Sequence, residues 1–270
     1  CVEVDGAAYW MSENGFFRYA GKLESLPCLV EDFVYDDINL ESGNQMVSAG
    51  LNNLFGEVIW FYPTSTSSVV NRMVAYNYFD SSPQRPVWTN GTLSRTVWKD
   101  SAVFGKPHAT EYDADTDTSF DVVGNTEGIT TYYQHETGTD QNKNGTITAV
   151  TANISSGDYD ITQARAQGTG QATGVATFRG DGEFLMKIRR FVPDFIAQTG
   201  TTRVTLQLKN YSNSSQAGSP LGPFDVTSST TKVDTRARAR AVAMKIENTA
   251  ASQTWKLGTF RLDIQPDGRR

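Results

Sequence analysis

The sequence has little of the material from which disulfide scaffolds and metal sites are built. Its 270 residues include two cysteines, Cys1 and Cys28, and two histidines, His108 and His135. A secreted domain of this length stapled by disulfides usually carries more cysteines, so we expect reduced, buried thiols. The histidines lack the His-x-His and His-x-x-x-His spacings of metal sites, and there is no Cys-x-x-Cys pair. We therefore interpret each histidine as an isolated loop or sheet-edge residue.

Membrane spans and the common catalytic motifs are also missing. No apolar run approaches the roughly 18 residues that a membrane-spanning helix needs, and none resembles a secretory signal. The sequence has no Gly-x-Ser-x-Gly elbow and no glycine-rich phosphate loop followed by Lys-Ser or Lys-Thr. Carboxylates are plentiful, but nothing singles out two of them as a glycosidase pair. We therefore predict a protein that is not an enzyme and that holds neither a metal nor another cofactor.

The composition predicts a globular chain with an acidic balance. Hydrophobic residues make up 38% and charged residues 20% of the sequence, which is typical of a folded domain and not of a disordered chain. The formal net charge of −6 opposes general binding to nucleic acid and favours a soluble or assembly role.

What the sequence has in abundance is short, aromatic-rich segments separated by tight turns. Tyr9–Met11 and Phe16–Tyr19 flank an Asn-Gly pair, which predicts a β-hairpin. Val58–Tyr62 ends at a proline, and Met73–Tyr78 ends at a polar turn. Arg203–Leu208 alternates between apolar and polar residues, as a strand with one buried face does. Many short strands at this density indicate packed antiparallel sheets.

Helical periodicity is nearly absent. The best case is Val30, Phe33, Val34 and Ile38, which predicts two or three turns of helix. We predict an all-β fold of consecutive antiparallel sheets, β-propeller-like, with very little helix; a sandwich or barrel is the alternative. The chain is expected to form a single β domain or an arc of blades, with approximate units at 1–50, 51–110, 111–165, 175–225 and 226–270.

Four tryptophans lie within the predicted strands, and we expect them to fill the sheet cores. They are Trp10, Trp60, Trp88 and Trp98.

Two acidic segments look like cation sites but are better interpreted as turns and loops. Asp140–Gly145 places oxygen donors at alternate positions and a glycine at the turn, like the first half of a calcium loop. The twelfth position is Thr151, where a bidentate glutamate is needed, so a hairpin tip is preferred. The second segment, interpreted as a solvated loop, contains Asp113, Asp115, Asp117 and Asp121.

A row of arginines is the most unusual charged feature. In one continuous strand, Arg236, Arg238 and Arg240 would project from the face opposite the alanines, and this face continues as apolar residues. The strand would then pass from an accessible end into a buried one. Two interpretations are open: an edge that meets a neighbouring subunit or DNA, and an intrachain ladder facing acidic strands. Arg269 and Arg270 add two charges after a Pro-Asp-Gly turn.

Several stretches together carry a likeness to a known family. They are Ala8–Phe17, Glu57–Pro63, Gly91–Trp98 and Trp255–Arg270, with shorter matches at Tyr76–Tyr78 and Tyr133–Gly138. The stretch WKLGTFRLDIQPDGRR at the end is the most specific. They resemble virion proteins of short-tailed bacteriophages, specifically the β-propeller proteins of the tail hub or nozzle and the related DNA-stabilisation proteins.

The resemblance implies a structural role with no catalytic residues. Proteins of this kind form rings at the portal-distal end of the tail and gate or sheathe the genome channel. On this resemblance, the expected location is the virion tail. The expected partners are copies of the chain itself, other tail or adaptor proteins and, in passing, the genome DNA. The likeness is to the C-terminal part of such proteins, so further residues are expected before Cys1.

Two other classes of function remain as alternatives. A carbohydrate- or receptor-binding β module would present an exposed aromatic platform. A glycan-cleaving enzyme would hold two carboxylates about 5 to 10 Å apart in a cleft.

Overall fold

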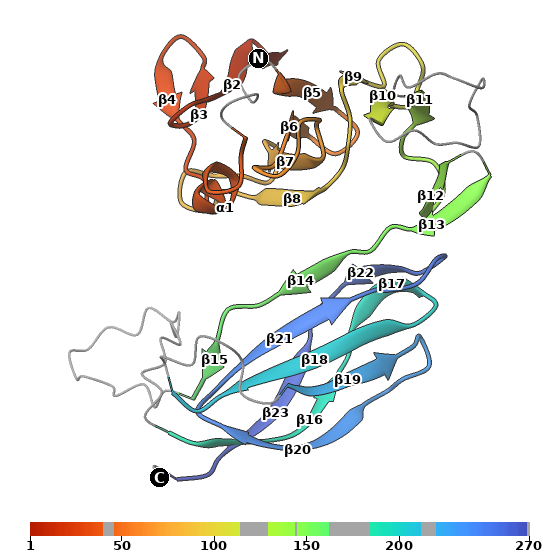
Figure 1. Cartoon of the computed structure of the whole chain (residues 1–270). Helices are drawn as coiled ribbons and strands as arrows, with labels where there is room; N and C mark the ends of the chain where they lie inside the picture. The colour runs from red at the N-terminus through yellow and green to blue at the C-terminus, as the bar shows by residue number, and fades with distance from the viewer. Residues whose placement is uncertain (40–45, 114–128, 144, 162–183, 212–219, 269–270) are drawn as a thin grey trace. The chain divides into compact units, whose positions relative to one another are not determined.

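A computed structural model describes residues 1–39, 46–113, 129–143, 145–161, 184–211 and 220–268 of the chain (Figure 1). The described chain consists mostly of strands in antiparallel sheets, which confirms the all-β prediction. It divides into two compact units, Cys1–Thr137 and Gly138–Arg270. This differs from the single domain or arc of five units that the sequence led us to expect. The reason is that buried residues on the two sides of this boundary enter separate hydrophobic clusters.

The elements of the first unit are, in chain order, β1 (Val2–Val4), β2 (Ala7–Ser12), β3 (Gly15–Tyr19), β4 (Leu23–Ser25), α1 (Glu31–Tyr35), β5 (Ser48–Asn52), β6 (Glu57–Tyr62), β7 (Arg72–Asn77), β8 (Trp88–Thr92), β9 (Val97–Lys99), β10 (His108–Asp113) and β11 (Ile129–Gln134). They form three meander sheets, β1-β2-β3-β4, β5-β6-β7-β8 and β9-β10-β11, in which strands adjacent in sequence are hydrogen-bonded neighbours. This is the predicted arrangement of consecutive antiparallel sheets.

The hairpin between β2 and β3 forms where the sequence predicts it. Ser12 pairs with Gly15, which leaves a two-residue turn between them. Gly15 has a φ of 131°, a backbone conformation that residues with a Cβ rarely adopt. The glycine therefore allows the chain to reverse and brings the aromatic residues of both strands into register.

The middle sheet of the first unit is covered on both faces. Strand β6 is buried at five of its six positions, so both sets of its alternating side chains are enclosed. On one face Trp60 packs against Phe16 of β3, with ring centroids 5.0 Å apart. On the other face Phe61 packs against Trp98 of β9, at 5.7 Å. The three sheets are thus stacked in chain order, as Figure 1 shows.

A short helix connects the first two sheets. The predicted helical segment forms α1 over Glu31–Tyr35 and buries Val34, and Ile38 is buried just beyond its end. Phe33, expected on the same apolar face, is exposed. Among the described residues, no helix has the length and apolar character needed to cross a membrane.

The elements of the second unit are β12 (Asp140–Lys143), β13 (Thr146–Ala149), β14 (Asn153–Ser155), β15 (Tyr159–Asp160), β16 (Met186–Val192), β17 (Phe195–Thr199), β18 (Thr202–Lys209), β19 (Leu221–Val226), β20 (Val233–Ala239), β21 (Ala241–Glu247), β22 (Thr254–Leu257) and β23 (Arg261–Pro266). One sheet has the order β14-β21-β18-β19, with β15 also paired to β21, and a second has the order β20-β16-β23. The pairs β12-β13 and β17-β22 complete the unit.

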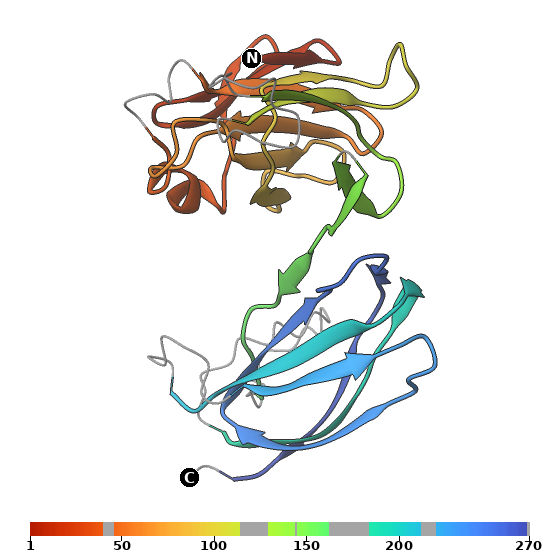
Figure 2. The same ribbon diagram turned by 45° about the vertical axis from the view of Figure 1, so that its right-hand side comes forward.

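The second unit departs from the expectation of consecutive sheets. Its two larger sheets lie face to face (Figure 2), and one hydrophobic cluster takes buried residues from both, such as Ile188 of β16 and Val204 of β18. Strands adjacent in sequence are assigned to different sheets, as β20 and β21 are. The unit is therefore built as a two-layered β-sandwich, the alternative that the strand pattern had left open.

The residues around the arginine row show why the chain passes from one sheet to the other between β20 and β21. In β20 the odd-numbered residues Thr235, Ala237 and Ala239 are buried, whereas in β21 the even-numbered Val242 and Ile246 are buried. The alternation of buried residues shifts by one position at residue 240, which lies between the end of β20 and the start of β21 in the other sheet. The prediction of one continuous strand is wrong here, because each half turns its own buried face toward the shared core.

Candidate functional site

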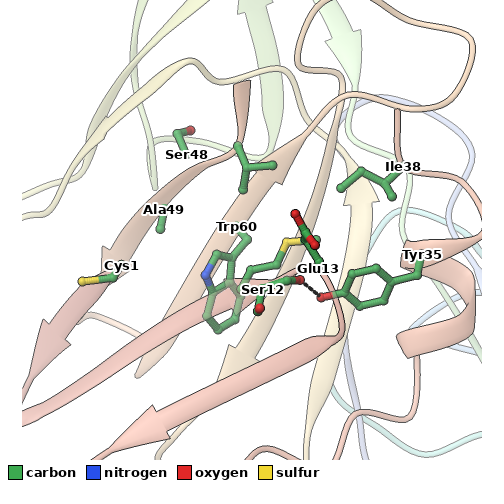
Figure 3. Close-up of a pocket in the computed structure, with 10 residues that line it drawn as sticks. Cys1, Ser12, Glu13, Tyr35, Ile38, Ser48, Ala49 and Trp60 are labelled. Carbon is green, nitrogen blue, oxygen red and sulfur yellow. Dashed lines mark hydrogen bonds between the residues drawn. The ribbon is translucent and has the colours of Figure 1, made fainter. Parts of the chain in front are cut away.

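A cavity of about 420 Å³ lies in the first unit, where the β2–β3 turn, the end of α1 and strands β5 and β6 meet (Figure 3). Its walls are formed by Cys1, Met11, Ser12, Glu13, Tyr35, Ile38, Val47, Ser48, Ala49 and Trp60. The Tyr35 hydroxyl donates a hydrogen bond to the Ser12 carbonyl at 2.6 Å and accepts one from the Gly15 amide at 3.1 Å. Burial raises the pKa of Tyr35 to about 12. The tyrosine therefore stays neutral and ties the helix to the hairpin turn.

Two hydrogen-bonding groups beside this cavity lack partners. The indole N–H of Trp60 and the hydroxyl of Ser48 are buried, and neither finds a hydrogen bond among the described residues. Trp60 is 1% exposed, so a ligand would have to displace neighbouring side chains to reach its N–H. The arrangement favours a structural contact between the first two sheets over a ligand-binding site.

A buried charged cluster lies at the third sheet, and no residue spacing in the sequence signals it. Arg95, just before β9, is 3% exposed and lies over the Tyr133 ring, with its guanidinium carbon 4.0 Å from the ring centroid. Its Nε donates to His135 Nε2 at 2.8 Å, and its Nη1 donates to Glu111 Oε2 at 3.4 Å. The arginine is thus held by an aromatic ring, an imidazole and a carboxylate from neighbouring strands.

Electrostatics in this cluster keep His135 neutral. Burial, and then the positive charge of Arg95, lower the pKa of His135 to about 4. A neutral ring with Nε2 as acceptor matches the hydrogen bond from Arg95. His108 lies close enough to contribute to the same shift, since β10 pairs it beside the end of β11. Both histidines lie at strand ends, as expected, since His108 begins β10 and His135 follows β11. They are not isolated from each other, however, and the cluster resembles a structural anchor more than a catalytic pair.

The four tryptophans do not share one environment. Trp60 is fully buried in the core between the first two sheets. Trp88 and Trp98 are partly buried, and their N–H groups donate to the carbonyls of Pro27 at 2.8 Å and Leu51 at 2.9 Å. These three have the core role expected of them.

Trp10 differs from that expectation, because it belongs to neither core cluster of the first unit. It lies on the outer face of the first sheet, stacked on Phe17 with ring centroids 5.8 Å apart. The reason is the alternation of β2, in which Ala7 and Tyr9 face the core and Trp10 faces outward.

The arginine row has mixed surroundings in the second unit. Arg238 pairs with Asp267 of the same chain, with Nε and Oδ2 2.5 Å apart, as the intrachain interpretation expects. Arg236 is exposed and makes no ion pair within the described part of the chain. Arg240 helps to line a hollow of about 290 Å³ with Tyr211 and Arg238. Arg269 and Arg270 lie outside the described residues.

The acidic segments do not form a described cation site. Asp140 belongs to the β12–β13 hairpin, and its two carboxylate oxygens each accept a hydrogen bond from the Ser252 amide at 2.9 Å. Of the second acidic segment, Asp113 ends β10, while Asp115, Asp117 and Asp121 lie outside the described residues. Within the described part of the chain, no group of three or more His, Cys, Asp or Glu is placed to hold a metal ion.

The two cysteines are both free thiols. Cys28 is partly buried, and burial raises its pKa to about 11, which keeps it protonated. Cys1 is exposed, so the expectation of burial is wrong for this residue.

Comparison of the sequence with protein-family models and with curated proteins gave no match.

Proposed function

We propose that this chain is a structural component of a bacteriophage virion, most directly a tail hub or nozzle protein that assembles as a ring around the genome channel. It carries out no catalysis in this role. Its partners are copies of itself and other tail or adaptor proteins, with passing contact to the genome DNA.

The observation that carries the proposal is the stack of three meander sheets in the first unit. Each sheet is made of consecutive strands, and the middle sheet is covered on both faces by its neighbours in the sequence. Consecutive blades of a β-propeller are arranged in this way, although a closed propeller needs roughly four to eight blades. The stack therefore supports the propeller-type subunit that the resemblance implies.

The stretches that resemble tail proteins fall on the strands that build both units. Ala8–Phe17 contains the β2–β3 hairpin, Glu57–Pro63 is the doubly buried β6, and Gly91–Trp98 leads into β9. Trp255–Arg270 contains β22 and β23, which line the core of the second unit. The likeness therefore involves residues that determine packing, which favours a shared architecture over a shared surface motif.

Immunogold electron microscopy tests this proposal. Antibodies raised against the chain are applied to particles produced from the phage genome that encodes it, with particles of an unrelated phage as control. We expect gold at the tail, at the end distal to the capsid. Label on the capsid, or no label on intact and on opened particles, would contradict the proposed location.

A carbohydrate- or receptor-binding role is the second candidate, and one observation favours it. The outer face of the first sheet carries the Trp10–Phe17 stack and the exposed ring of Tyr19. Aromatic rings on a flat sheet can stack on sugar rings. Binding of the chain to an array of bacterial surface glycans, lost in Trp10→Ala but kept in Phe104→Ala, would support this candidate.

A further inference from the structure

The outer face of the first sheet is an apolar surface that no other sheet among the described residues of the first unit covers. We call it the leading face; it consists of the outward side chains of β1–β4, namely Glu3, Ala8, Trp10, Phe17, Tyr19, Leu23 and Ser25. Leu23 is 58% exposed and Tyr19 51%. Trp10 and Phe17 are partly buried by stacking on each other, and neither joins a core cluster of the first unit. A surface of this kind on a sheet is typical of a binding interface.

The outer face of the third sheet is apolar as well. We call it the trailing face; it consists of Val97, Lys99, Phe104, His108, Thr110, Tyr112 and Tyr132. Tyr132 is 64% exposed and Val97 61%. Tyr132 stacks on His108, and its hydroxyl is hydrogen-bonded to His108 Nδ1. The stack of three sheets thus has an aromatic surface at each end.

The two faces carry opposite charges. Glu3 on the leading face and Lys99 on the trailing face are both exposed, and neither forms an ion pair within the described part of the chain. Two leading faces would bring two carboxylates together, and two trailing faces would bring two ammonium groups together. A leading face against a trailing face pairs opposite charges, which sets orientation.

Contacts inside the unit show that sheets of this composition pack face to face. The middle sheet uses Trp60 against Phe16 on one side and Phe61 against Trp98 on the other. The end faces offer the same combination of aromatic and aliphatic side chains, and no sheet among the described residues of the first unit covers them. Another sheet of the same kind is thus the occupant that continues the packing.

We propose that the leading face of one copy of this chain binds the trailing face of the next, in a head-to-tail contact that continues the stack of sheets between subunits. This inference rests on the proposed function, because a head-to-tail contact generates a ring when its rotation closes. It assigns one contact of the ring to the first unit.

Charge reversal tests the contact by sedimentation velocity of the 270-residue chain over a concentration series. We expect Glu3→Lys alone and Lys99→Glu alone each to weaken self-association roughly tenfold, because each places like charges together. The double variant, and an equal mixture of the two single variants, should restore wild-type association. If two identical faces met instead, the double variant would not regain wild-type association. A double variant that fails to regain it would therefore overturn the head-to-tail assignment.

Truncation of exposed apolar residues tests the same contact independently of charge. Leu23→Ser and Tyr132→Ser should each reduce association more than Ile196→Ser, a matched control at a position that is 67% exposed in the second unit. All three variants should keep the wild-type circular dichroism spectrum and melting temperature. Equal association in all three variants would overturn the inference.

The outcomes also separate this inference from the proposed function. A wild-type chain that assembles but is insensitive to every change on the two faces would overturn the contact and leave the tail role standing. A wild-type chain that stays monomeric at all concentrations would overturn the contact as well. The tail role itself fails on the immunogold result, which does not depend on which surfaces meet.

Discussion

Trp60 is the residue on which the core of the first unit most depends. Its ring is buried between two sheets and contacts Phe16 and Trp88, with centroids 5.0 and 6.0 Å apart. Trp10 lies on an outer face of the same unit and stacks on Phe17 alone among the described rings. The two tryptophans therefore make different contributions to stability, although the sequence assigned them the same role.

We predict that Trp60→Ala lowers the free energy of unfolding by about 3 to 5 kcal/mol, because it leaves a large cavity between packed sheets. Trp10→Ala should cost clearly less, since its ring is partly solvated in the folded chain. Urea denaturation followed by circular dichroism measures both. Equal losses for the two variants would show that Trp10 is covered within the subunit.

His135 makes the stability of the first unit depend on pH. The pKa of His135 is about 4 in the folded chain and 6.5 ordinarily. Between these two pH values the side chain is protonated in the unfolded chain and neutral in the folded chain. The free energy of unfolding should therefore fall as the pH decreases from about 6.5 toward about 4.

The variant His135→Gln keeps an acceptor for Arg95 and cannot titrate, so its melting temperature should fall less steeply than that of the wild type over this range. Differential scanning fluorimetry across a pH series measures the slopes, and His108→Gln serves as a control at the other histidine. Parallel slopes for wild type and His135→Gln would show that other groups cause the pH dependence.

At the scale of elements, strand β20 presents its arginines outward while its threonine and alanines enter the core. Arg238 is satisfied by Asp267, which leaves Arg236 as the better candidate for a contact outside the chain. An exposed ion pair contributes about 0 to 1 kcal/mol, so these arginines have little weight in the stability of the unit.

We predict that changing Arg236, Arg238 and Arg240 together to glutamine leaves the monomer folded and weakens ring or tail assembly. The difference from wild type should be largest at low salt, because added salt screens the charges of the wild-type protein. Sedimentation velocity at several salt concentrations measures this difference, with Arg203→Gln, a change of an exposed arginine on β18, as the control. Unchanged assembly at every salt concentration would reject the interface interpretation of the arginine row.

The elements that could be predicted from the sequence are those determined by residues close together along the chain. The β2–β3 hairpin and strand β18 followed from a turn signal and from alternation, both of which act over a few residues. The assignment of β20 and β21 to different sheets did not follow, because a one-residue change of phase at Arg240 looks like continued alternation. The cluster around Arg95 was also missed, since its members lie up to 40 residues apart and match no motif.

At the scale of the whole molecule, the chain combines two kinds of β architecture. The first unit stacks meander sheets in chain order, whereas the second encloses one core between two sheets with crossed connections. Each unit has a core of its own, so each presents its own surface to possible partners. The ring that we propose rests on the first unit, in which the stack of sheets has an apolar face at each end.

A cryo-electron microscopy reconstruction of the phage tail tests the ring most directly. The account predicts several copies of this chain around the genome channel, with β1–β4 of each copy packed against β9–β11 of the next. A tail in which this chain is present as a single copy, or lies away from the channel, would contradict the account.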